Sequence, residues 1–300
     1  MLSIKKQGQF FPLLKQLLVV FVLSLLFACS RFDVAAFTHD SSFTKVVRMG
    51  GSFQHQVFES RLSHSFTVAP TCCDRQLLHI YIEGDGRPWI SPGHIARDPT
   101  PVNPLMLRLM ALDPAPAIYV GRPCYFQLMD DYCSPEWWTH KRYAERIVSS
   151  IDHVIQQYAI GYDGVVLLGH SGGGTLAMLL AQRRQDVQAL VTLAGNLDIE
   201  QWAKLHSYSS LKGSLNPAME TPLPESILQQ HFLGKNDDNI TPIVLRNTIE
   251  KQAAAQLYLL DNVDHLDGWV QRWPTLLQAL KQELTLEQTR GDSDALNLGD

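Results

Sequence analysis

Two hydrophobic periodicities alternate along most of the chain. Short apolar runs rich in β-branched and aromatic residues are typical of buried strands, and they are QLLHIYIEG (76–84), AIYVGRP (117–123), GVVLLG (164–169), VQALVTLAG (187–195), ILQQHFLG (227–234) and AQLYLLDNV (255–263). Apolar residues recur at i, i+3 and i+4 in other segments, which predicts amphipathic helices, over residues 137–158, 173–184, 242–253 and 268–284. Strands that alternate with helices predict an α/β fold, with a mainly parallel sheet covered on both faces.

The remaining segments complete a predicted domain over residues 46–285. Residues 29–45 are polar and mixed, which favours a tether, and a pair of strands is expected within His55–Pro70. The alternation of predicted strands and helices is interrupted at residues 197–225, which contain several prolines. The polar residues 286–300 are expected to form a flexible tail.

One glycine-rich stretch lies at the carboxyl end of a predicted central strand, where parallel sheets bind their ligands. Residues 169–173 read GHSGG, which matches G-x-S-x-G, between a predicted strand and a predicted helix. A sharp turn at this junction exposes the hydroxyl of Ser171, and glycines avoid collisions in that turn. The helix that follows directs free N–H groups and the positive end of its dipole toward the serine. The pattern therefore indicates a serine nucleophile.

Three other interpretations of this stretch are weaker. In a phosphate-binding loop a lysine is required where Thr175 stands. In a dinucleotide-binding loop Ala177 would occupy the third glycine position, and no first βαβ unit surrounds the stretch. The third alternative is a glycine-rich turn without any chemistry.

At this point the chain resembles the α/β-hydrolase superfamily over roughly residues 50–285. The resemblance implies a sheet of about eight strands and a catalytic triad in the chain order nucleophile, acid, histidine. The segment HFLGKNDDNITP (231–242) is similar to the family's acid loop, and Asp238 fits it best, with Asp237 and Asp198 as alternatives. His265 follows the last predicted strand, where the family's catalytic histidine lies.

The resemblance also implies an oxyanion hole and a cap. In the segment EGD (83–85), Asp85 stands where the family supplies a backbone N–H donor, and its partner would be the N–H of Gly172. A free carboxylate beside a developing oxyanion would be harmful, so Asp85 is expected to point away or to pair with Arg87 or Arg122. Residues 197–225 would form a small cap insertion. The aromatic side chains expected to line an acyl pocket are Trp89, Trp202 and Tyr208.

These residues predict hydrolysis of carboxylic esters through an acyl-enzyme, without a cofactor or metal ion. A peptidase, an amidase or a thioesterase would use the same triad. The other alternative is an envelope binding protein that has the same fold and no catalytic activity. The motifs EGDGRPW, DPTPVNPL and GRPCYF resemble those of a group of bacterial α/β-hydrolase-type proteins.

The N-terminus and the charge predict where the protein works. Residues 1–28 combine three lysines with the uncharged run LLVVFVLSLLFA, which is typical of a secretory signal peptide, with an uncleaved anchor as the alternative. The segment LFACS resembles the lipobox of bacterial lipoproteins, which implies a lipid on Cys29 and a membrane anchor. Ser30 after this cysteine favours the outer membrane, facing the periplasm. The formal net charge of −5 makes a nucleic-acid partner improbable.

The other four cysteines fit an oxidising compartment. Cys124 and Cys133 flank a short loop and are predicted to form a disulfide. The adjacent Cys72 and Cys73 rarely bond to each other because the ring would be strained. None of the spacings is of the C-x-x-C type that binds zinc.

Overall fold

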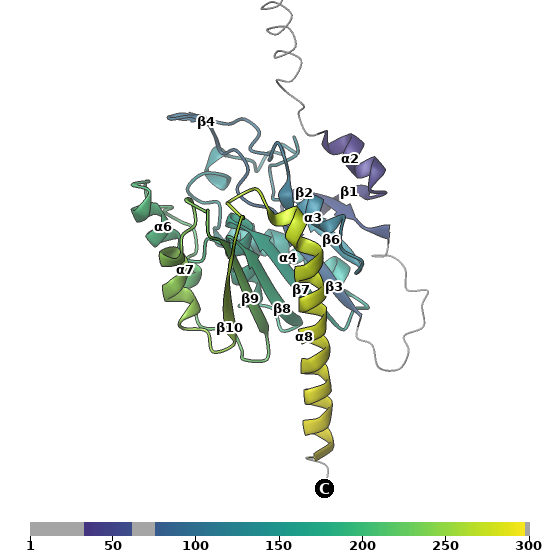
Figure 1. Cartoon of the computed structure of the whole chain (residues 1–300). Helices are drawn as coiled ribbons and strands as arrows, with labels where there is room; N and C mark the ends of the chain where they lie inside the picture. Colours follow the sequence, from purple (N-terminus) through teal and green to yellow (C-terminus); the bar gives the residue numbers. More distant parts are fainter. Residues whose placement is uncertain (1–32, 62–75, 298–300) are drawn as a thin grey trace, which may run out of the picture.

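The computed structural model describes residues 33–61 and 76–297 of the 300-residue chain. These residues form an eight-stranded sheet in the order β1-β2-β6-β3-β7-β8-β9-β10 (Figure 1). The six strands from β6 to β10 in this order are parallel, whereas β1 and β2 are added in antiparallel fashion. The predicted α/β class and the mainly parallel sheet are confirmed.

The strands of the main sheet are β1 (Thr44–Gly50), β2 (Phe53–Glu59), β3 (Leu77–Ile82), β6 (Ala117–Val120), β7 (Gly164–His170), β8 (Val187–Leu193), β9 (Leu228–Gly234) and β10 (Ala255–Leu260). The helices are α2 (Val34–Asp40), α3 (Leu105–Met110), α4 (Glu145–Ala159), α5 (Gly172–Ala181), α6 (Ile199–Leu205), α7 (Pro242–Ile249) and α8 (Trp269–Asn297). Two short 3-10 turns, Pro135–Trp137 and Pro217–Met219, lie in the connections.

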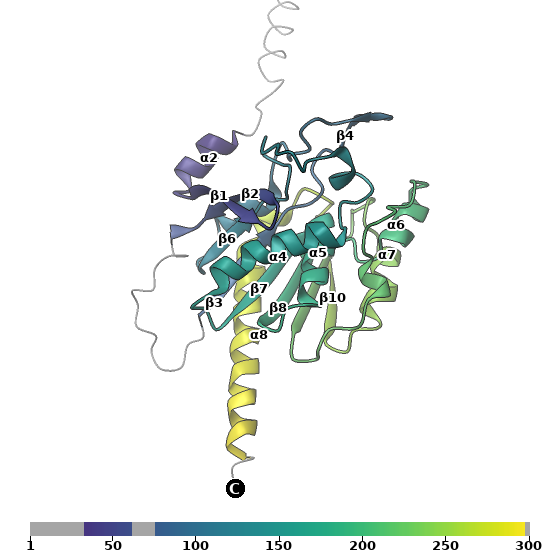
Figure 2. The same cartoon turned by 180° about the vertical axis from the view of Figure 1, so that it is seen from behind.

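Helices cover both faces of the sheet, as the hydrophobic pattern predicts. α3 and α8 lie on one face, and α4 and α5 lie on the other (Figures 1 and 2). α4 buries the apolar side chains Ile147, Val148, Ile151, Val154 and Ile155 against the sheet. On the opposite face Trp273 of α8 packs edge-on against Tyr81 of β3. The carboxyl ends of the parallel strands therefore meet at one open edge, where ligands bind in such sheets.

The chain ends are more ordered than their polar composition predicts. Residues 33–45 of the expected tether form α2 and the start of β1, because the carboxylate of Asp33 accepts hydrogen bonds from the N–H groups of Ala35 and Ala36. Most of the expected tail continues α8, which ends at Asn297. Of the strand pair expected within His55–Pro70, the first strand overlaps β2 (Phe53–Glu59) and the second lies outside the described residues. The partner of β2 is β1 (Thr44–Gly50), which comes before the expected range.

Two further findings concern the cysteines and the membrane. Cys124 and Cys133 form the expected disulfide, whereas the signal peptide, Cys29, Cys72 and Cys73 lie outside the described residues. Within the described ranges, the apolar character and length of the helices do not reach what a membrane crossing requires.

Candidate active site

The turn between β7 and α5 holds the backbone of Ser171 in an unusual conformation. β7 ends at His170, α5 begins at Gly172, and Ser171 between them has φ 52° and ψ −119°. A non-glycine residue at positive φ is strained, and such strain is typical of functional sites. A Cβ on Gly169 would lie 2.3 Å from the carbonyl oxygen of Gly173, and one on Gly173 would lie 2.2 Å from that of Ile82. The glycines are therefore required by close backbone contacts around the serine.

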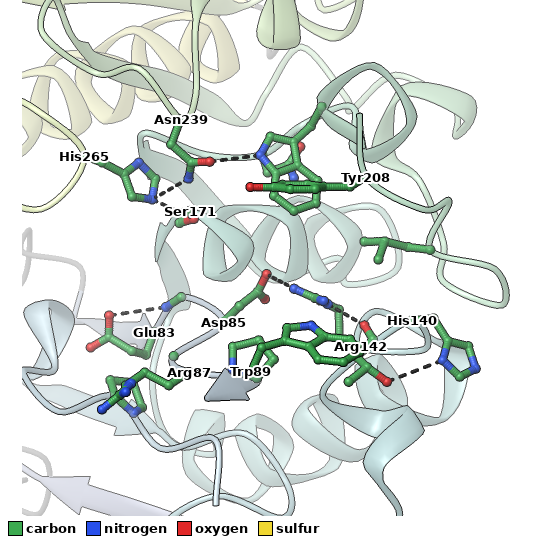
Figure 3. Close-up of a pocket in the computed structure, with 18 of the residues that line it drawn as sticks. Glu83, Asp85, Arg87, Trp89, His140, Arg142, Ser171, Tyr208, Asn239 and His265 are labelled. Atoms are coloured by element: carbon green, nitrogen blue, oxygen red, sulfur yellow. Dashed lines mark hydrogen bonds and ion pairs between the residues drawn. The ribbon is translucent and has the colours of Figure 1, made fainter. Parts of the chain in front are cut away.

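Ser171, His265 and an aspartate form a continuous line of hydrogen bonds. Oγ of Ser171 lies 3.1 Å from Nε2 of His265, and Nδ1 of His265 lies 2.9 Å from Oδ2 of Asp237. His265 comes from the loop between β10 and α8, as expected from the sequence (Figure 3). Because the carboxylate accepts from Nδ1, Nε2 is left as the nitrogen that can take the proton of the serine.

The aspartate in this line is Asp237, so the preference for Asp238 was wrong. Asp237 is buried and Asp238 is exposed. Oδ1 of Asp237 accepts hydrogen bonds from the N–H groups of Asn239 (2.9 Å) and Ile240 (2.8 Å), which leaves Oδ2 for His265. This local turn fixes the direction of the Asp237 side chain, and the next residue consequently points to solvent.

The second alternative, Asp198, has a structural role at the start of α6. Its carboxylate accepts hydrogen bonds from the N–H of Gln201 (3.1 Å) and from the side-chain amide of Asn216 (3.0 Å). Asp198 is therefore a helix cap that also fixes the segment after β8.

His170, directly before Ser171, contacts His265 through its ring and a hydrogen bond. Sequence reasoning did not assign it a role. Its Nε2 donates a hydrogen bond to the backbone carbonyl of His265 (2.7 Å), and the centroids of the two rings are 4.9 Å apart. Burial lowers the pKa of His170 to about 3, so its ring is neutral at physiological pH. The carbonyl can only accept, which places the proton of His170 on Nε2.

The carboxylate of Asp85 is held by two arginines and a tyrosine hydroxyl. Nη1 of Arg142 donates to it at 2.8 Å, Nη1 of Arg122 donates to the other oxygen, and the hydroxyl of Tyr143 donates at 2.7 Å. Burial opposes the charge of Asp85, but the two arginines outweigh it and hold its pKa well below the usual range. The expected pairing with Arg122 is present, and Arg142, rather than Arg87, is the second partner.

The neighbouring carboxyl group of Glu83 fixes the same loop. It accepts hydrogen bonds from the N–H groups of Gly84 (3.2 Å) and Met106 (3.0 Å). Its burial raises the pKa to about 7, although both hydrogen bonds act in the other direction. Glu83 thus links the end of β3 to the start of α3.

The two residues expected to form the oxyanion hole lie beside each other and beside Ser171. A Cβ on Gly84 would be 3.4 Å from Cβ of Ser171, and one on Gly172 would be 2.1 Å from Oδ1 of Asp85. Gly172 is the first residue of α5, so its N–H has no acceptor within the helix. The hydroxyl of Tyr125 donates to the backbone carbonyl of Asp85 (2.8 Å), which fixes the peptide that joins Asp85 to Gly86.

Asn239 connects His265 to the segment after β8, and no sequence pattern predicted this contact. Its Nδ2 lies 3.0 Å from Nε2 of His265, and its Oδ1 accepts a hydrogen bond from Nε1 of Trp202 (3.1 Å). An indole nitrogen only donates, so the amide oxygen must face Trp202 and the NH₂ group must face His265. Figure 3 shows Asn239 between His265 and the aromatic side chains near Tyr208.

The serine opens into a cavity of about 1300 Å³. Trp89, Trp202 and Tyr208, the three aromatic residues predicted for substrate binding, all line it. Its lining includes residues 83–89 and 91–93, which follow β3, and residues 208–212, which follow α6. A cavity of this size accommodates a long acyl chain. Among residues 33–61 and 76–297, no three His, Cys, Asp or Glu side chains are grouped to hold a metal ion.

Comparisons with known proteins identify the fold. Searches found no matching family model and no matching curated protein. Solved structures do match: a serine hydrolase homologue with the α/β fold from Coxiella burnetii has a TM-score of 0.52 and 13% identity, over 80% of this chain and 97% of that one. An esterase from Pyrococcus furiosus has a TM-score of 0.52 and 11% identity, over 84% and 95%.

A puromycin-hydrolysing peptidase from Mycobacterium tuberculosis has a TM-score of 0.57 and 15% identity, over 81% of this chain and 39% of that one. These neighbours include an esterase and a peptidase, and their sequence identity to this chain is low. The comparison therefore establishes the α/β-hydrolase fold, and the reaction has to be argued from the site.

Proposed function

We propose that the protein is a serine hydrolase that cleaves carboxylic esters. The observation that carries this proposal is the line of hydrogen bonds from Ser171 through His265 to Asp237, with Ser171 and His265 in the lining of a large cavity. A nucleophile, a base within hydrogen-bond reach and a carboxylate that orients the base are the elements of acyl transfer.

In the proposed mechanism Oγ of Ser171 attacks the carbonyl carbon of the ester while Nε2 of His265 accepts its proton. Asp237 keeps the remaining proton on Nδ1 and stabilises the imidazolium ion that forms. His265 then donates the proton to the leaving alcohol, which leaves an acyl group on Ser171. A water molecule, deprotonated by the same nitrogen, releases the acid and restores the enzyme.

The N–H groups of Gly172 and Asp85 are proposed to bind the oxyanion. Both residues lie beside Ser171, Gly172 begins α5, and the side chain of Asp85 is held by Arg122 and Arg142. Donors that are already oriented require no reorganisation when the negative charge develops, which is why such donors accelerate the reaction strongly. The pairing of the Asp85 carboxylate with Arg122 and Arg142 keeps its own charge from opposing the oxyanion.

The cavity supports an ester with an apolar acyl group. Its wall includes Trp89, Trp202, Tyr208 and Leu266. A peptidase that binds a free amino terminus needs an available carboxylate. The two carboxyl groups that line the cavity, Glu83 and Asp85, are both engaged in fixing the loop around the oxyanion site.

A matched series of substrates tests the proposal. p-Nitrophenyl esters of increasing acyl length and the corresponding p-nitroanilides are compared with the wild type and the Ser171→Ala variant. We expect turnover of esters, with a preference for medium or long acyl chains, and at least a thousandfold loss in the variant. Faster turnover of anilides than of esters would favour a peptidase or amidase, and no turnover of either would contradict the proposal.

We further propose that the protein is exported and attached to the cell envelope through a lipid on Cys29, as the N-terminal sequence predicts. Labelling of growing cells with an alkyne analogue of palmitate tests this attachment. Label on the wild type but not on the Cys29→Ser variant is expected. Equal labelling of the two forms would contradict it.

A further inference from the structure

A small hairpin projects from the wall of the cavity and exposes apolar side chains. β4 (Trp89–Ser91) and β5 (His94–Ile95) form a two-stranded sheet of their own, separate from the main sheet. Trp89 is 45% exposed, Ile90 66% and Ile95 40%. Three large apolar side chains within seven residues of one exposed element are unusual for a surface that meets only water.

The base of this hairpin is firmly attached, so the apolar side chains do not fold back into the core. The N–H of Ala96 donates to the carbonyl of Pro88 (2.9 Å), and Nε1 of Trp138 donates to the carbonyl of Ala96 (3.1 Å). Trp138 itself is buried. The fold therefore holds the tip of the hairpin outward.

The charges of the hairpin are of one sign. The chain has 30 acidic residues in 300, yet none falls between Gly86 and Arg97. Arg87 and Arg97 flank the apolar residues, and both are exposed. Tryptophan and isoleucine between two arginines are the composition that the interface of a bilayer favours, where apolar side chains enter the lipid and cations meet phosphate groups.

The hairpin forms part of the lining of the cavity. Trp89 and Ser91 line the cavity, and so do the exposed side chains Tyr208 and Leu266. The hairpin and α2 lie at the same end of the molecule, and the C-terminal end of α8 lies at the other end (Figures 1 and 2). Cys29, the proposed site of lipid attachment, precedes α2 by only five residues in the sequence, so this attachment would place the hairpin near the bilayer.

We propose that the β4–β5 hairpin docks into the interfacial layer of a phospholipid bilayer and brings the mouth of the cavity to the lipid. In this arrangement Ile90 and Ile95 enter the region of the acyl chains, and Arg87 and Arg97 contact the phosphate groups. The docking does not require that the protein hydrolyses esters. Together with the proposed ester hydrolysis, this docking identifies a lipid acyl ester of the bilayer as the substrate.

The test measures vesicle binding by residues 30–300, which retain the whole buried core from Phe53 to Leu280. Ser171→Ala is present in every form, so the vesicles stay intact and binding is separated from catalysis. Sedimentation with phosphatidylcholine vesicles that contain phosphatidylglycerol is compared for this form, for Ile90→Ser with Ile95→Ser, and for Ile160→Ser. Ile160 is 72% exposed and lies at the end of α4, before β7 begins, so it controls for the loss of a surface isoleucine.

We expect the hairpin variant to bind vesicles about tenfold or more weakly and the Ile160 variant to bind as the parent does. Equal binding of all three forms, or no binding by the parent, would overturn the proposal. A concentration-dependent dimer that only the hairpin substitutions abolish, without vesicle binding, would identify the hairpin as a contact between copies and would also overturn it. A second set of proteins, which carries the same isoleucine substitutions and keeps Ser171, reports separately on the proposed function. Its turnover of soluble p-nitrophenyl butyrate should match that of the wild type, because neither Ile90 nor Ile95 lines the cavity.

Discussion

The side-chain amide of Asn239 donates a hydrogen bond to Nε2 of His265 at 3.0 Å, and Oγ of Ser171 lies 3.1 Å from the same nitrogen. A neutral imidazole has one lone pair on this atom, so the two donors compete for it. Trp202 keeps the amide in this orientation from the cavity wall. A shift of Trp202 in the cavity wall therefore changes how readily Nε2 of His265 accepts the proton of Ser171.

Replacement of Asn239 by alanine should release this competition. We expect Asn239→Ala to react with a small fluorophosphonate about two to five times faster than the wild type, because the lone pair is then free for Ser171. The second-order rate of labelling measures this effect. A tenfold slower reaction would contradict it and would show that Asn239 mainly holds His265 in place.

Substitution of the two adjacent aspartates separates the triad acid from its neighbour. In Asp237→Asn an amide replaces the acceptor at Nδ1 and favours the wrong tautomer of His265, so kcat/KM for a p-nitrophenyl ester should fall by about 10³–10⁴. Asp238→Asn is the matched control, since this side chain is exposed, and should change kcat/KM less than about twofold. A large loss in the control with little effect at Asp237 would reverse the assignment.

The sequence predicted the sheet, the serine turn and His265 because each depends on local patterns: periodicity, a glycine-rich motif and a position after a strand. It could not separate Asp237 from Asp238, because the spacing fits both and only the turn that Asp237 forms with the N–H groups of Asn239 and Ile240 decides between them. It also missed Arg142 and Asn239. Arg142 is 57 residues from Asp85, and Trp202 is 37 residues from Asn239, so no local pattern reports these contacts.

The buried histidines predict that the protein loses stability in mild acid. Burial lowers the pKa of His55 to about 4, of His170 to about 3 and of His231 to about 4, from 6.5. Below pH 6.5 the unfolded chain binds three protons that the folded chain excludes, which destabilises the fold. Glu83 acts in the opposite sense, because burial raises its pKa from 4.5 to about 7 and the folded chain alone binds that proton between these values.

The unfolded chain binds three more protons on the histidines and one fewer on Glu83, so unfolding takes up a net of about two protons. The free energy of unfolding should therefore fall by about 2–3 kcal/mol per pH unit between pH 6 and pH 5. Urea unfolding at several pH values measures this slope. His231→Gln should reduce the slope by about 1.4 kcal/mol per pH unit, since it removes one of the three protons. A free energy of unfolding that is constant over this range would contradict the burial of these neutral rings.

The disulfide should contribute measurably to stability. It joins residues 9 apart in the sequence, and closing a loop of this length in the unfolded chain is expected to stabilise the fold by about 2–3 kcal/mol. Cys133→Ala should therefore lower the Tm of the oxidised protein by about 5 °C. After reduction with dithiothreitol, the wild type and the variant should melt together. An unchanged Tm in the oxidised variant would show that the disulfide does not stabilise the fold.

The central claim is that Ser171 is an activated nucleophile. It is tested most directly by labelling folded residues 30–300 with a fluorophosphonate probe, in the wild type and in Ser171→Ala. The account predicts stoichiometric labelling of the wild type, located by mass spectrometry on the peptide that contains Ser171, and none of the variant. Folded wild-type protein that stays unlabelled, or a variant that is labelled equally, would contradict the account and would favour a binding protein that kept this fold without its chemistry.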